Sequence, residues 1–422
     1  AYQYQNIGAK MVNAETGEVS VHNENFFRDL SNYALAWSLE EDGVETQNGT
    51  IADLDVPAQQ TKNFTIPYDK SKIKGKEVFL NIDFRLKEAE PLLTAGQVMA
   101  YAQLPVVAKQ ACCGDCSKML AQGHGKKKMK LAAKKNNVVA VTTPNLTFKI
   151  DRSTGLISEY AYNGKSLLGE GGTLKPNFWR APTDNDMGAG LQKNFKAWKN
   201  PQMNLKNIEV KKDKKTNSVI ILTSFDMPEV QGQMDITYVV FANTGAVKVT
   251  EDFKATEGAK VSDMFRFGML MQMPYTMEKS NYYGRGPIEN YSDRKDCMRI
   301  GVYTDDADNQ YFPYIRPQES GTKSDIRWWK QTDATGMGLQ VKSCTPFYAS
   351  AIHFDTEELD DGDDKEQRHS FDLKKSKYTN LFLDAAHMGV GGENSWGAWP
   401  LEKYRVHYGN KTFTFTLIPQ GK

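Results

Sequence analysis

Cysteine is scarce in this sequence, with 5 residues in 422, and the number is odd. Three of them crowd together as Cys112, Cys113 and Cys116, whereas Cys297 and Cys344 stand alone. This pattern excludes a small fold stapled by disulfides. It favours a reducing compartment, although one or two bridges would also fit the count.

An excess of charge of one sign and a long apolar run are also missing. Lys and Arg number 53 against 52 Asp and Glu, for a net charge of +1, which argues against a protein that binds nucleic acid with its whole surface. No uninterrupted apolar run approaches the roughly 20 residues of a membrane helix, and the polar N-terminal segment contains no signal-peptide core. The chain starts at Ala1 rather than Met, and we expect it to be part of a larger protein.

Sustained helical periodicity is absent as well, and alternation with a period of two takes its place. In residues 78–86 every even position is apolar and nearly every odd position is polar, which predicts a strand with one buried face. Residues 233–249, with the turn sequence Asn-Thr-Gly, predict a hairpin, and residues 146–157 predict another. Residues 412–417 predict a final strand, and segments such as 190–198 are single helices at most. The sequence therefore predicts an all-β protein.

One stretch breaks this pattern. From Lys109 to Lys135 there are eight lysines and one acidic residue, Asp115, with few residues able to build a core. This composition predicts a solvated linker. The alternative is a zinc site made by the thiol and imidazole groups of Cys112, Cys113, Cys116 and His124. Adjacent cysteines beside a lysine run do not match the spacing of a zinc knuckle.

The sequence therefore predicts three parts, namely a first domain at residues 1–105, the linker at 106–136 and a second domain at 137–422. The first part has the length of an immunoglobulin-like β-sandwich, and Trp37 and the turn after Glu41 suit such a fold. The third part is too long for one sandwich. We therefore expect a large domain of two β-sheets there.

Three segments carry clustered acidic residues. Asp184 and Asp186, and likewise Glu289 and Asp293, are interleaved with Arg, Asn, Pro and Gly. This mixture is typical of loops in which arginine satisfies carboxylates, so structural roles are favoured over catalytic ones. Residues 360–364 lack the spacing of an EF-hand calcium loop and predict a solvated loop. We identify no catalytic residue and no metal ligand in the chain.

The most informative segment is residues 387–396, with the sequence HMGVGGENSW. Three glycines in four positions shape a loop, and the loop ends in Trp396. A tryptophan offers a flat apolar face on which the C–H groups of a sugar ring stack, while Glu393 and Asn394 suit the hydroxyl groups. Taken alone, the segment leaves two alternatives for Trp396, a packed anchor and a sugar platform.

Three motifs together resemble a known family. They are FWRAPTDND at 178–186, YGRGPIENYSDR at 283–294 and HMGVGGENSW at 387–396. In this order they resemble the C-terminal domain of the large bacterial β-galactosidases of glycoside hydrolase family 2. Residues 1–105, with the sequence Phe-Phe-Arg at 26–28, resemble the sandwich domain that precedes it. The resemblance covers nearly the whole chain except the cysteine- and lysine-rich linker.

The resemblance implies that residues 137–422 form a β supersandwich of the galactose-mutarotase type. It also implies a parent enzyme that hydrolyses terminal β-D-galactosides with retention, through two glutamates of a catalytic barrel. This sequence shows no βα alternation and no barrel motif, so we expect those glutamates, and the magnesium and sodium ligands, outside this chain. The expected partners are the missing N-terminal and barrel domains, and a homo-oligomer is possible.

The resemblance also implies a site. In the family, an aromatic residue of the last domain stacks on the sugar at the active-site mouth, and Trp396 is similar to it. Glu393 and Asn394 accompany it, and the segment from Gly188 to Gln192 resembles a loop that borders the mouth, although its last residues differ from the family pattern. The expected ligand is a β-galactoside or galactose. The expected contribution of the chain is scaffold, assembly surface and a substrate-contacting tryptophan.

Three alternatives stay open. The first is a carbohydrate-binding module. The second is a small subunit without hydrolase activity, and the predicted sandwich at 1–105 argues against it. The third is an aldose 1-epimerase, which needs a histidine and a glutamate as acid and base. His353, His369 and His387 are available, but none lies in a motif of those enzymes. The aglycone, and the compartment in a bacterium (cytoplasm or periplasm), are left undetermined.

Overall fold

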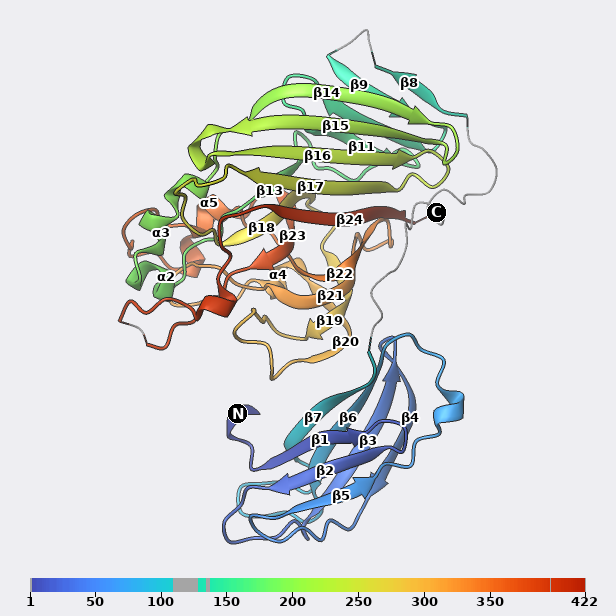
Figure 1. Ribbon diagram of the computed structural model, residues 1–422, viewed down its shortest axis with the longest axis vertical. Helices are drawn as coiled ribbons and strands as arrows, with labels where there is room; N and C mark the ends of the chain where they lie inside the picture. The colour runs from blue at the N-terminus through green and yellow to red at the C-terminus, as the bar shows by residue number, and fades with distance from the viewer. Residues whose placement is uncertain (1, 109–127, 134–136, 395, 422) are drawn as a thin grey trace. The chain divides into compact units, whose positions relative to one another are not determined.

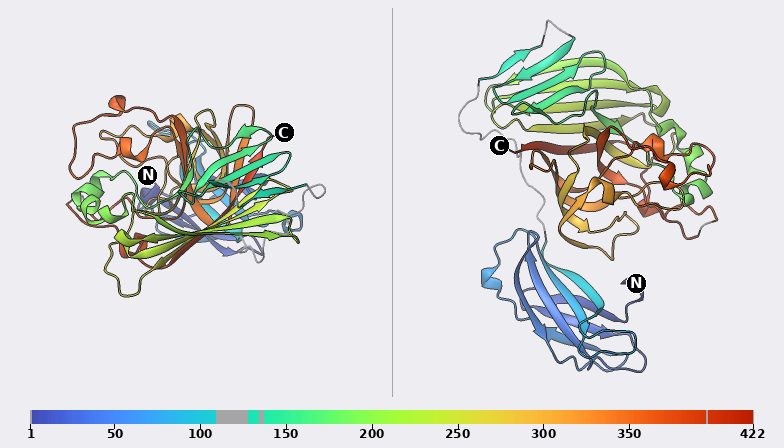
Figure 2. Two further views of the ribbon diagram at one scale, coloured as in Figure 1. Left: turned by 90° about the horizontal axis from the view of Figure 1, so that it is seen from above. Right: turned by 180° about the vertical axis from the view of Figure 1, so that it is seen from behind.

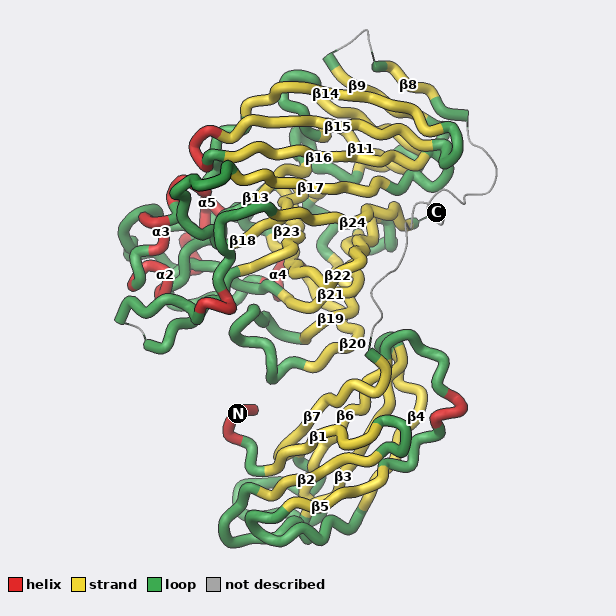
Figure 3. The backbone as a smooth tube through the Cα atoms, in the orientation of Figure 1, coloured by secondary structure: helices red, strands yellow, loops and turns green. Residues whose placement is uncertain are grey.

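Strands make up nearly all of the regular structure of this protein (Figure 3). The computed structural model describes residues 2–108, 128–133, 137–394 and 396–421. The all-β fold predicted from the period-two alternation is confirmed. In these described ranges, no helix has the length and apolar character needed to cross a membrane.

The described chain forms two compact units, one of residues up to 108 with Arg299–Val302 and one of the remainder. In the first, a sheet in the order β1-β2-β5 packs on a sheet in the order β4-β3-β6-β7 (Figure 1). Along β3 every second side chain is buried, including Trp37 at 7% exposure, so one core fills the space between the sheets. The elements are η1 (Tyr2–Tyr4), β1 (Ile7–Asn13), β2 (Glu18–Asn23), β3 (Tyr33–Glu41), β4 (Val44–Ile51), β5 (Thr61–Thr65), η2 (Lys70–Lys72), β6 (Val78–Leu86) and β7 (Val98–Val107).

The second unit contains a five-stranded sheet and, apart from Arg299–Val302 of β20, a twelve-stranded sheet. The main path of the large sheet runs β13-β18-β23-β22-β24-β17-β16-β15-β14, and β19, β20 and β21 branch from β22. Its strands are β13 (Leu174–Asn177), β14 (Asn204–Asp213), β15 (Ser218–Met227), β16 (Gly232–Phe241), β17 (Val247–Ala255), β18 (Arg266–Pro274), β19 (Lys279–Gly286), β20 (Arg299–Asp306), β21 (Lys323–Thr332), β22 (Gly338–Ile352), β23 (Tyr378–His387) and β24 (Lys411–Gln420). The small sheet holds β8 (Lys130–Ala132), β9 (Val138–Thr142), β10 (Leu146–Asp151), β11 (Ile157–Tyr162) and β12 (Lys165–Ser166).

The hairpins predicted from alternation are present. β16 pairs antiparallel with β17, and β10 pairs antiparallel with β11. The small sheet covers the long strands β14–β17 (Figures 1 and 2), and the rings of Phe148 and Tyr238 meet across the layers at 5.9 Å. One continuous core therefore joins the two sheets and holds the second unit together.

The predicted linker, residues 106–136, lies largely outside the described residues, and so do the proposed zinc ligands Cys112, Cys113, Cys116 and His124. Its described parts include strand residues. Residues 106–107 end β7, and residues 130–132 form β8, which pairs with β9. Leu131 packs against the core of the second unit, so this part of the stretch is an edge strand rather than linker.

Helices α2 (Asp184–Gly188), α3 (Leu191–Asn194) and α5 (Thr356–Leu359) gather with several loops at one end of the sheets of the second unit, on the left in Figure 1. The loop that follows β23 belongs to this end, which we call the loop end. The helices of this unit are α2 (Asp184–Gly188), α3 (Leu191–Asn194), η3 (Lys196–Trp198), η4 (Pro228–Val230), α4 (Ala307–Gln310), α5 (Thr356–Leu359), η5 (Ser370–Asp372) and η6 (Glu402–Tyr404).

Candidate functional site

The loop after β23 presents Trp396 to solvent. Its side chain is 93% exposed, and Glu393 and Asn394 are exposed beside it. The backbone N–H of Trp396 donates to Oδ1 of Asn394 at 2.9 Å, which closes a tight turn at the tip. Of the two alternatives for Trp396, a packed anchor within this chain is therefore excluded.

The base of the same loop is held by Asp293, which lies about a hundred residues earlier in the sequence. Its carboxylate accepts the backbone N–H groups of Val390 at 3.1 Å and Gly391 at 2.8 Å. A Cβ at Gly389 would come within 2.5 Å of Asp293 Oδ2, so a side chain there would push the carboxylate away. The glycines of this loop thus permit the close approach of backbone to carboxylate.

A buried arginine holds the loop from the other side. Arg180 is fully buried and forms a bidentate pair with Asp186, at 3.0 Å and 2.8 Å. Its remaining N–H groups donate to the carbonyl oxygens of Met388 at 2.7 Å and Gly389 at 2.9 Å. The Asn185 amide adds a bond to the carbonyl oxygen of Val390 at 3.1 Å. Backbone N–H and C=O groups at the base of the loop therefore have hydrogen-bond partners on both sides, and these bonds fix the position from which the tip projects.

Helix α2 brings Gly188 to this loop. A capping box starts the helix, in which Thr183 and Asp186 exchange side-chain to backbone hydrogen bonds. At its other end, a Cβ on Gly397 would lie 3.2 Å from the carbonyl oxygen of Gly188, and Gly397 has φ of +97°. The structure thus brings together Gly188, Glu393, Asn394 and Trp396, the four residues predicted from the sequence. Their contact with a ligand stays a prediction.

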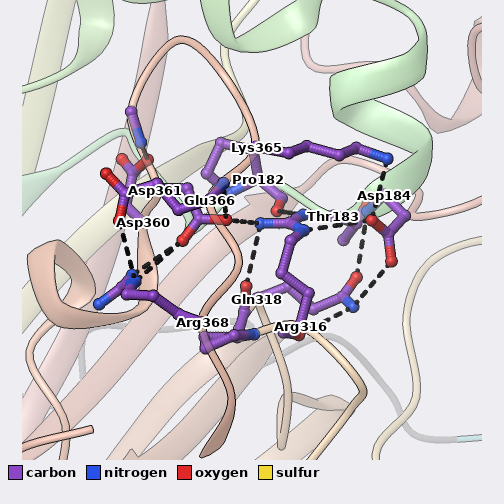
Figure 4. Close-up of polar contacts among 12 residues, drawn as sticks. Pro182, Thr183, Asp184, Arg316, Gln318, Asp360, Asp361, Lys365, Glu366 and Arg368 are labelled. Carbon is purple, nitrogen blue, oxygen red and sulfur yellow. Dashed lines mark hydrogen bonds and ion pairs between the residues drawn. The ribbon is translucent and has the colours of Figure 1, made fainter. Parts of the chain in front are cut away.

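The start of α2 is tied to a second group of loops, which Figure 4 shows in close-up. Asp184 accepts from Arg316 at 3.2 Å and from Gln318 at 3.3 Å, and it pairs with Lys365 at 3.1 Å. Partial burial works to raise the pKa of Asp184, but the two cations outweigh it and hold the pKa below its usual value. The charges at this position are therefore neutralised within the chain.

The prediction that residues 360–364 form a solvated loop is wrong for its first half. The side chain of Asp361 is 1% exposed and pairs with Arg316 at 2.8 Å and Arg368 at 2.9 Å (Figure 4). The side chain of Asp360 is equally buried, and its carboxylate accepts the indole N–H of Trp179 at 2.8 Å. Such burial is tolerable because each carboxylate is paired. The second half of the run is exposed, and it pairs with lysines of α3 and η3.

Under the loop lies a buried ionisable cluster that the sequence did not suggest. His387, the last residue of β23, donates from Nδ1 to the carbonyl oxygen of Met388 at 3.0 Å and accepts from Arg266 at 2.7 Å. Burial, then the charges of Arg266 and Arg180, lower the pKa of His387 far below its usual value. His387 is therefore neutral at physiological pH.

Two carboxyl groups belong to the same buried region. Burial raises the pKa of Asp384 to about 7, against the attraction of Arg266, whose Nε lies 3.6 Å away. Burial also raises the pKa of Glu251 well above its usual value. The signal that could have revealed Asp384 is its place as the one charged residue among the apolar side chains of β23.

Each of the three histidines considered for an epimerase has polar contacts within the chain. His353 is fully buried between Asp308 and Thr379, with ring nitrogens 2.9 Å and 3.0 Å from them, and His387 is buried as described. His369 is exposed, but its Nδ1 lies 3.2 Å from the carbonyl oxygen of Ile315. In the parts of the chain that the structure describes, no three His, Cys, Asp or Glu side chains come together as metal ligands.

Comparison with known sequences places the chain in a family. The model of the family described as "Beta galactosidase small chain" matches residues 142–417, and that of "Beta-galactosidase, domain 4" matches residues 19–107. The chain therefore belongs to the β-galactosidase small-chain family, and the predicted resemblance is confirmed.

Two relatives show the extent of the match. A β-galactosidase of Priestia megaterium is 29% identical over 421 residues, which are 99% of this chain and 39% of that protein. A β-galactosidase of Lactobacillus delbrueckii subsp. bulgaricus is 27% identical over 383 residues, which are 90% of this chain and 36% of that protein. The chain thus spans less than two-fifths of these relatives and corresponds to a C-terminal part of them.

A solved structure also overlaps with the protein. A candidate aldose 1-epimerase from Escherichia coli K12 aligns over 69% of this chain and 99% of that chain, at 9% identity. The TM-score is 0.35.

Proposed function

We propose that this chain is the non-barrel part of a retaining β-galactosidase, to which it contributes scaffold, assembly surface and a substrate-contacting tryptophan. The observation that carries the proposal is the 93% exposure of Trp396 on a loop whose base is saturated with buried hydrogen bonds. A large aromatic ring that is exposed to solvent on a loop held by hydrogen bonds favours a contact with a ligand or with another domain. Family membership favours a sugar as the ligand.

In this proposal the chain's own residues bind and orient, and the parts of the enzyme outside this chain perform the bond cleavage. Trp396 offers its face to the C–H groups of a galactosyl ring, and Glu393 and Asn394 bind hydroxyl groups. Asp293 and Arg180 position the loop and do not touch the substrate. Magnesium and sodium are proposed to belong to the parts of the enzyme outside this chain.

The test is a kinetic comparison in the full-length gene product. Removal of a stacking platform costs on the order of 1 kcal/mol, so Trp396→Ala is expected to raise the KM for a nitrophenyl β-galactoside about fivefold, with a smaller change in kcat. Trp396→Phe keeps an aromatic face and serves as the control. An unchanged KM in Trp396→Ala would remove the substrate contact from the proposal.

A carbohydrate-binding module is the second candidate, because the same exposed ring would serve it. Measurements on the 422-residue chain and on the full-length product together separate the two functions. No hydrolysis of the nitrophenyl β-galactoside by the chain alone is expected under either function, and turnover that co-purifies with it would contradict both. Hydrolysis by the full-length product supports the enzyme. Galactose binding that is lost in Trp396→Ala, together with an inactive full-length product, supports the binding module.

A further inference from the structure

A small open pocket lies where β13, β18 and α5 of the second unit come together (Figure 1). Its volume, including the open mouth, is about 350 Å³, and small-molecule sites occupy about 300–1,000 Å³. We call it the Lys175 pocket. Among the described residues that line it, none belongs to the loop after β23. Its walls include Lys175 and Asn177 of β13, Leu270 of β18, Lys199, Glu357 and Asp360.

The two strands build one wall of this pocket. β13 and β18 are antiparallel neighbours, in which Lys175 lies opposite Leu270 and Asn177 lies opposite Gly268. Opposite residues of such a pair, and every second residue along a strand, lie on the same face of the sheet. Lys175, Asn177 and Leu270 therefore share one face, and the Lys175 pocket lies on that face.

Asn177 brings an unused hydrogen-bond donor to the wall. Its Oδ1 accepts the backbone N–H of Trp179 at 3.3 Å, which orients the amide group. Its Nδ2 is buried, and within the described residues it has no hydrogen-bond partner. A buried donor without an acceptor destabilises the folded chain, and a ligand oxygen that accepts from it would remove this cost.

Lys175 adds a second donor group to the same wall. Its side chain is half-buried, and its ammonium has no hydrogen bond or ion pair with any residue in the part of the chain that the structure describes. An ammonium group carries three N–H donors. Lys175 and Asn177 can therefore both donate to oxygen atoms of a ligand in the pocket.

Carboxylates form another part of the wall. The buried carboxylate of Asp360 is fixed by Lys199 at 2.7 Å and by the indole N–H of Trp179 at 2.8 Å. Glu357 of α5 is exposed, and it accepts a long hydrogen bond from Nδ2 of Asn200 at 3.4 Å. A carboxylate has about four acceptor positions, so Glu357 can accept further hydrogen bonds from a ligand.

The balance of charge in the pocket selects the class of ligand. Asp360 neutralises Lys199, and the charge of Glu357 offsets that of Lys175, so the four charges sum to zero. A phosphate or carboxylate ligand needs an excess of cations, and a metal ion needs several converging carboxylates. A neutral ligand with hydroxyl groups fits better, because a hydroxyl can accept from Lys175 or Asn177 and donate to Glu357.

We propose that the Lys175 pocket binds a neutral pyranose ring at a site separate from Trp396. Lys175 and Asn177 donate to its hydroxyl oxygens, and Glu357 accepts from its hydroxyl groups. Leu270 offers an apolar contact to the C–H groups of the ring. Such a site is independent of the proposed function, because it requires neither hydrolysis nor the tryptophan of the loop after β23.

An NMR titration of the 422-residue chain carrying Trp396→Ala with methyl β-D-galactoside tests the proposal. The indole N–H of Trp179 is the reporter, because it donates to Asp360 in the pocket wall. A ligand of this size is expected to bind with a Kd on the order of 1 mM. The Trp179 resonance should move along a saturating curve, while that of Trp198, which donates to Ser262, stays in place. No movement of the Trp179 resonance at about 100 mM galactoside, or equal movement of both resonances, overturns the proposal.

Two substitutions in the same background locate the bound sugar. Lys175→Met and Glu357→Gln each remove a charge and nearly preserve the side-chain length, and each is expected to weaken binding at least about fivefold. Lys206→Met and Glu209→Gln, at exposed positions of β14, are the matched controls and should bind as the parent does. An unchanged Trp198 resonance shows that a variant is folded. Equal affinity in the pocket variants and their controls overturns the proposal, and so does tighter binding of inorganic phosphate than of the galactoside.

Discussion

The base and the tip of the loop after β23 are built in opposite ways. At the base, charged groups such as Arg180 and Asp186 are buried and every polar contact is made within the chain. At the tip, an aromatic ring is 93% exposed. Folding alone favours the reverse distribution, with apolar groups inside and charges in water. The base therefore serves the structure of this chain, and the exposed tip is consistent with the proposed contact with a ligand or another domain.

Removal of the arginine at the base is expected to have the largest effect on stability. Arg180→Met would leave the Asp186 carboxylate buried without its partner, and we expect a loss of about 3–5 kcal/mol in the free energy of unfolding. Urea unfolding of the 422-residue chain measures it. Lys196→Met, which removes an exposed pair with Asp363, is the control and should cost no more than about 1 kcal/mol. Similar losses in the two variants would contradict the structural role of the base.

The buried cluster beneath the loop gives a prediction about pH. A folded-state pKa of about 7 for Asp384 means that the folded protein keeps a proton that the unfolded chain releases near pH 4. This contribution to stability is complete below pH 4 and is lost as pH rises through 7. The shift corresponds to at most about 4 kcal/mol, at roughly 1.4 kcal/mol for each pH unit.

Asp384→Asn removes this titration. We expect the variant to be more stable than the wild type at pH 8 and to lose less stability between pH 4 and pH 8. Thermal unfolding across this range measures both effects, and Asp296→Asn, at an exposed position, is the control. Parallel stability curves for Asp384→Asn and the wild type would contradict the raised pKa.

Asp293 connects the base to the tip, and its removal should act locally. Asp293→Ala deletes the acceptor of two backbone N–H groups, a loss of about 1.5–3 kcal/mol for a bond to a charged group. Amide exchange at Val390 and Gly391 is therefore expected to become at least about tenfold faster. Asp296→Ala is the control. Unchanged exchange at these two amides would mean that the loop does not depend on Asp293.

The smallest effect is expected at the tip itself. Trp396→Ala removes a side chain that packs on little within this chain, so the free energy of unfolding should change by less than about 0.5 kcal/mol. Trp198 is fully buried, and Trp198→Ala is expected to cost about 3–5 kcal/mol. The two variants differ only in the location of the tryptophan, so the difference between their free energies of unfolding measures the effect of burial. A large loss in Trp396→Ala would show that the ring supports the fold.

Much of the architecture could be predicted from local patterns. Alternation of apolar and polar residues identifies β6 and the β16–β17 hairpin. In a strand with one buried face, every second side chain points into the core, so apolar residues recur with a period of two. The glycines at 389, 391 and 392 indicate a loop, and at Gly389 a Cβ would collide with the carboxylate of Asp293. The motif order also led to the family, which is confirmed.

Other features could not be predicted because their partners are distant in the sequence. Asp361 lies in a run of acidic residues that predicts a solvated loop, yet it forms a buried ion pair with Arg316, which is 45 residues earlier in the sequence. Asp384 and Arg266 meet because β18 and β23 are neighbours in the sheet, which no local pattern records. The composition around residues 130–132 predicts a linker, but these residues form a strand because they pair with β9.

The all-β class, the positions of most of the strands discussed here and the family follow from the amino-acid sequence alone, because they depend on periodicity and on motifs that are contiguous in the chain. The tertiary structure decided which charges are buried and which apolar groups are left outside. Burial is a property of neighbours brought together by folding, so the exposure of Trp396 and Ile315 became visible only when the loop end was assembled.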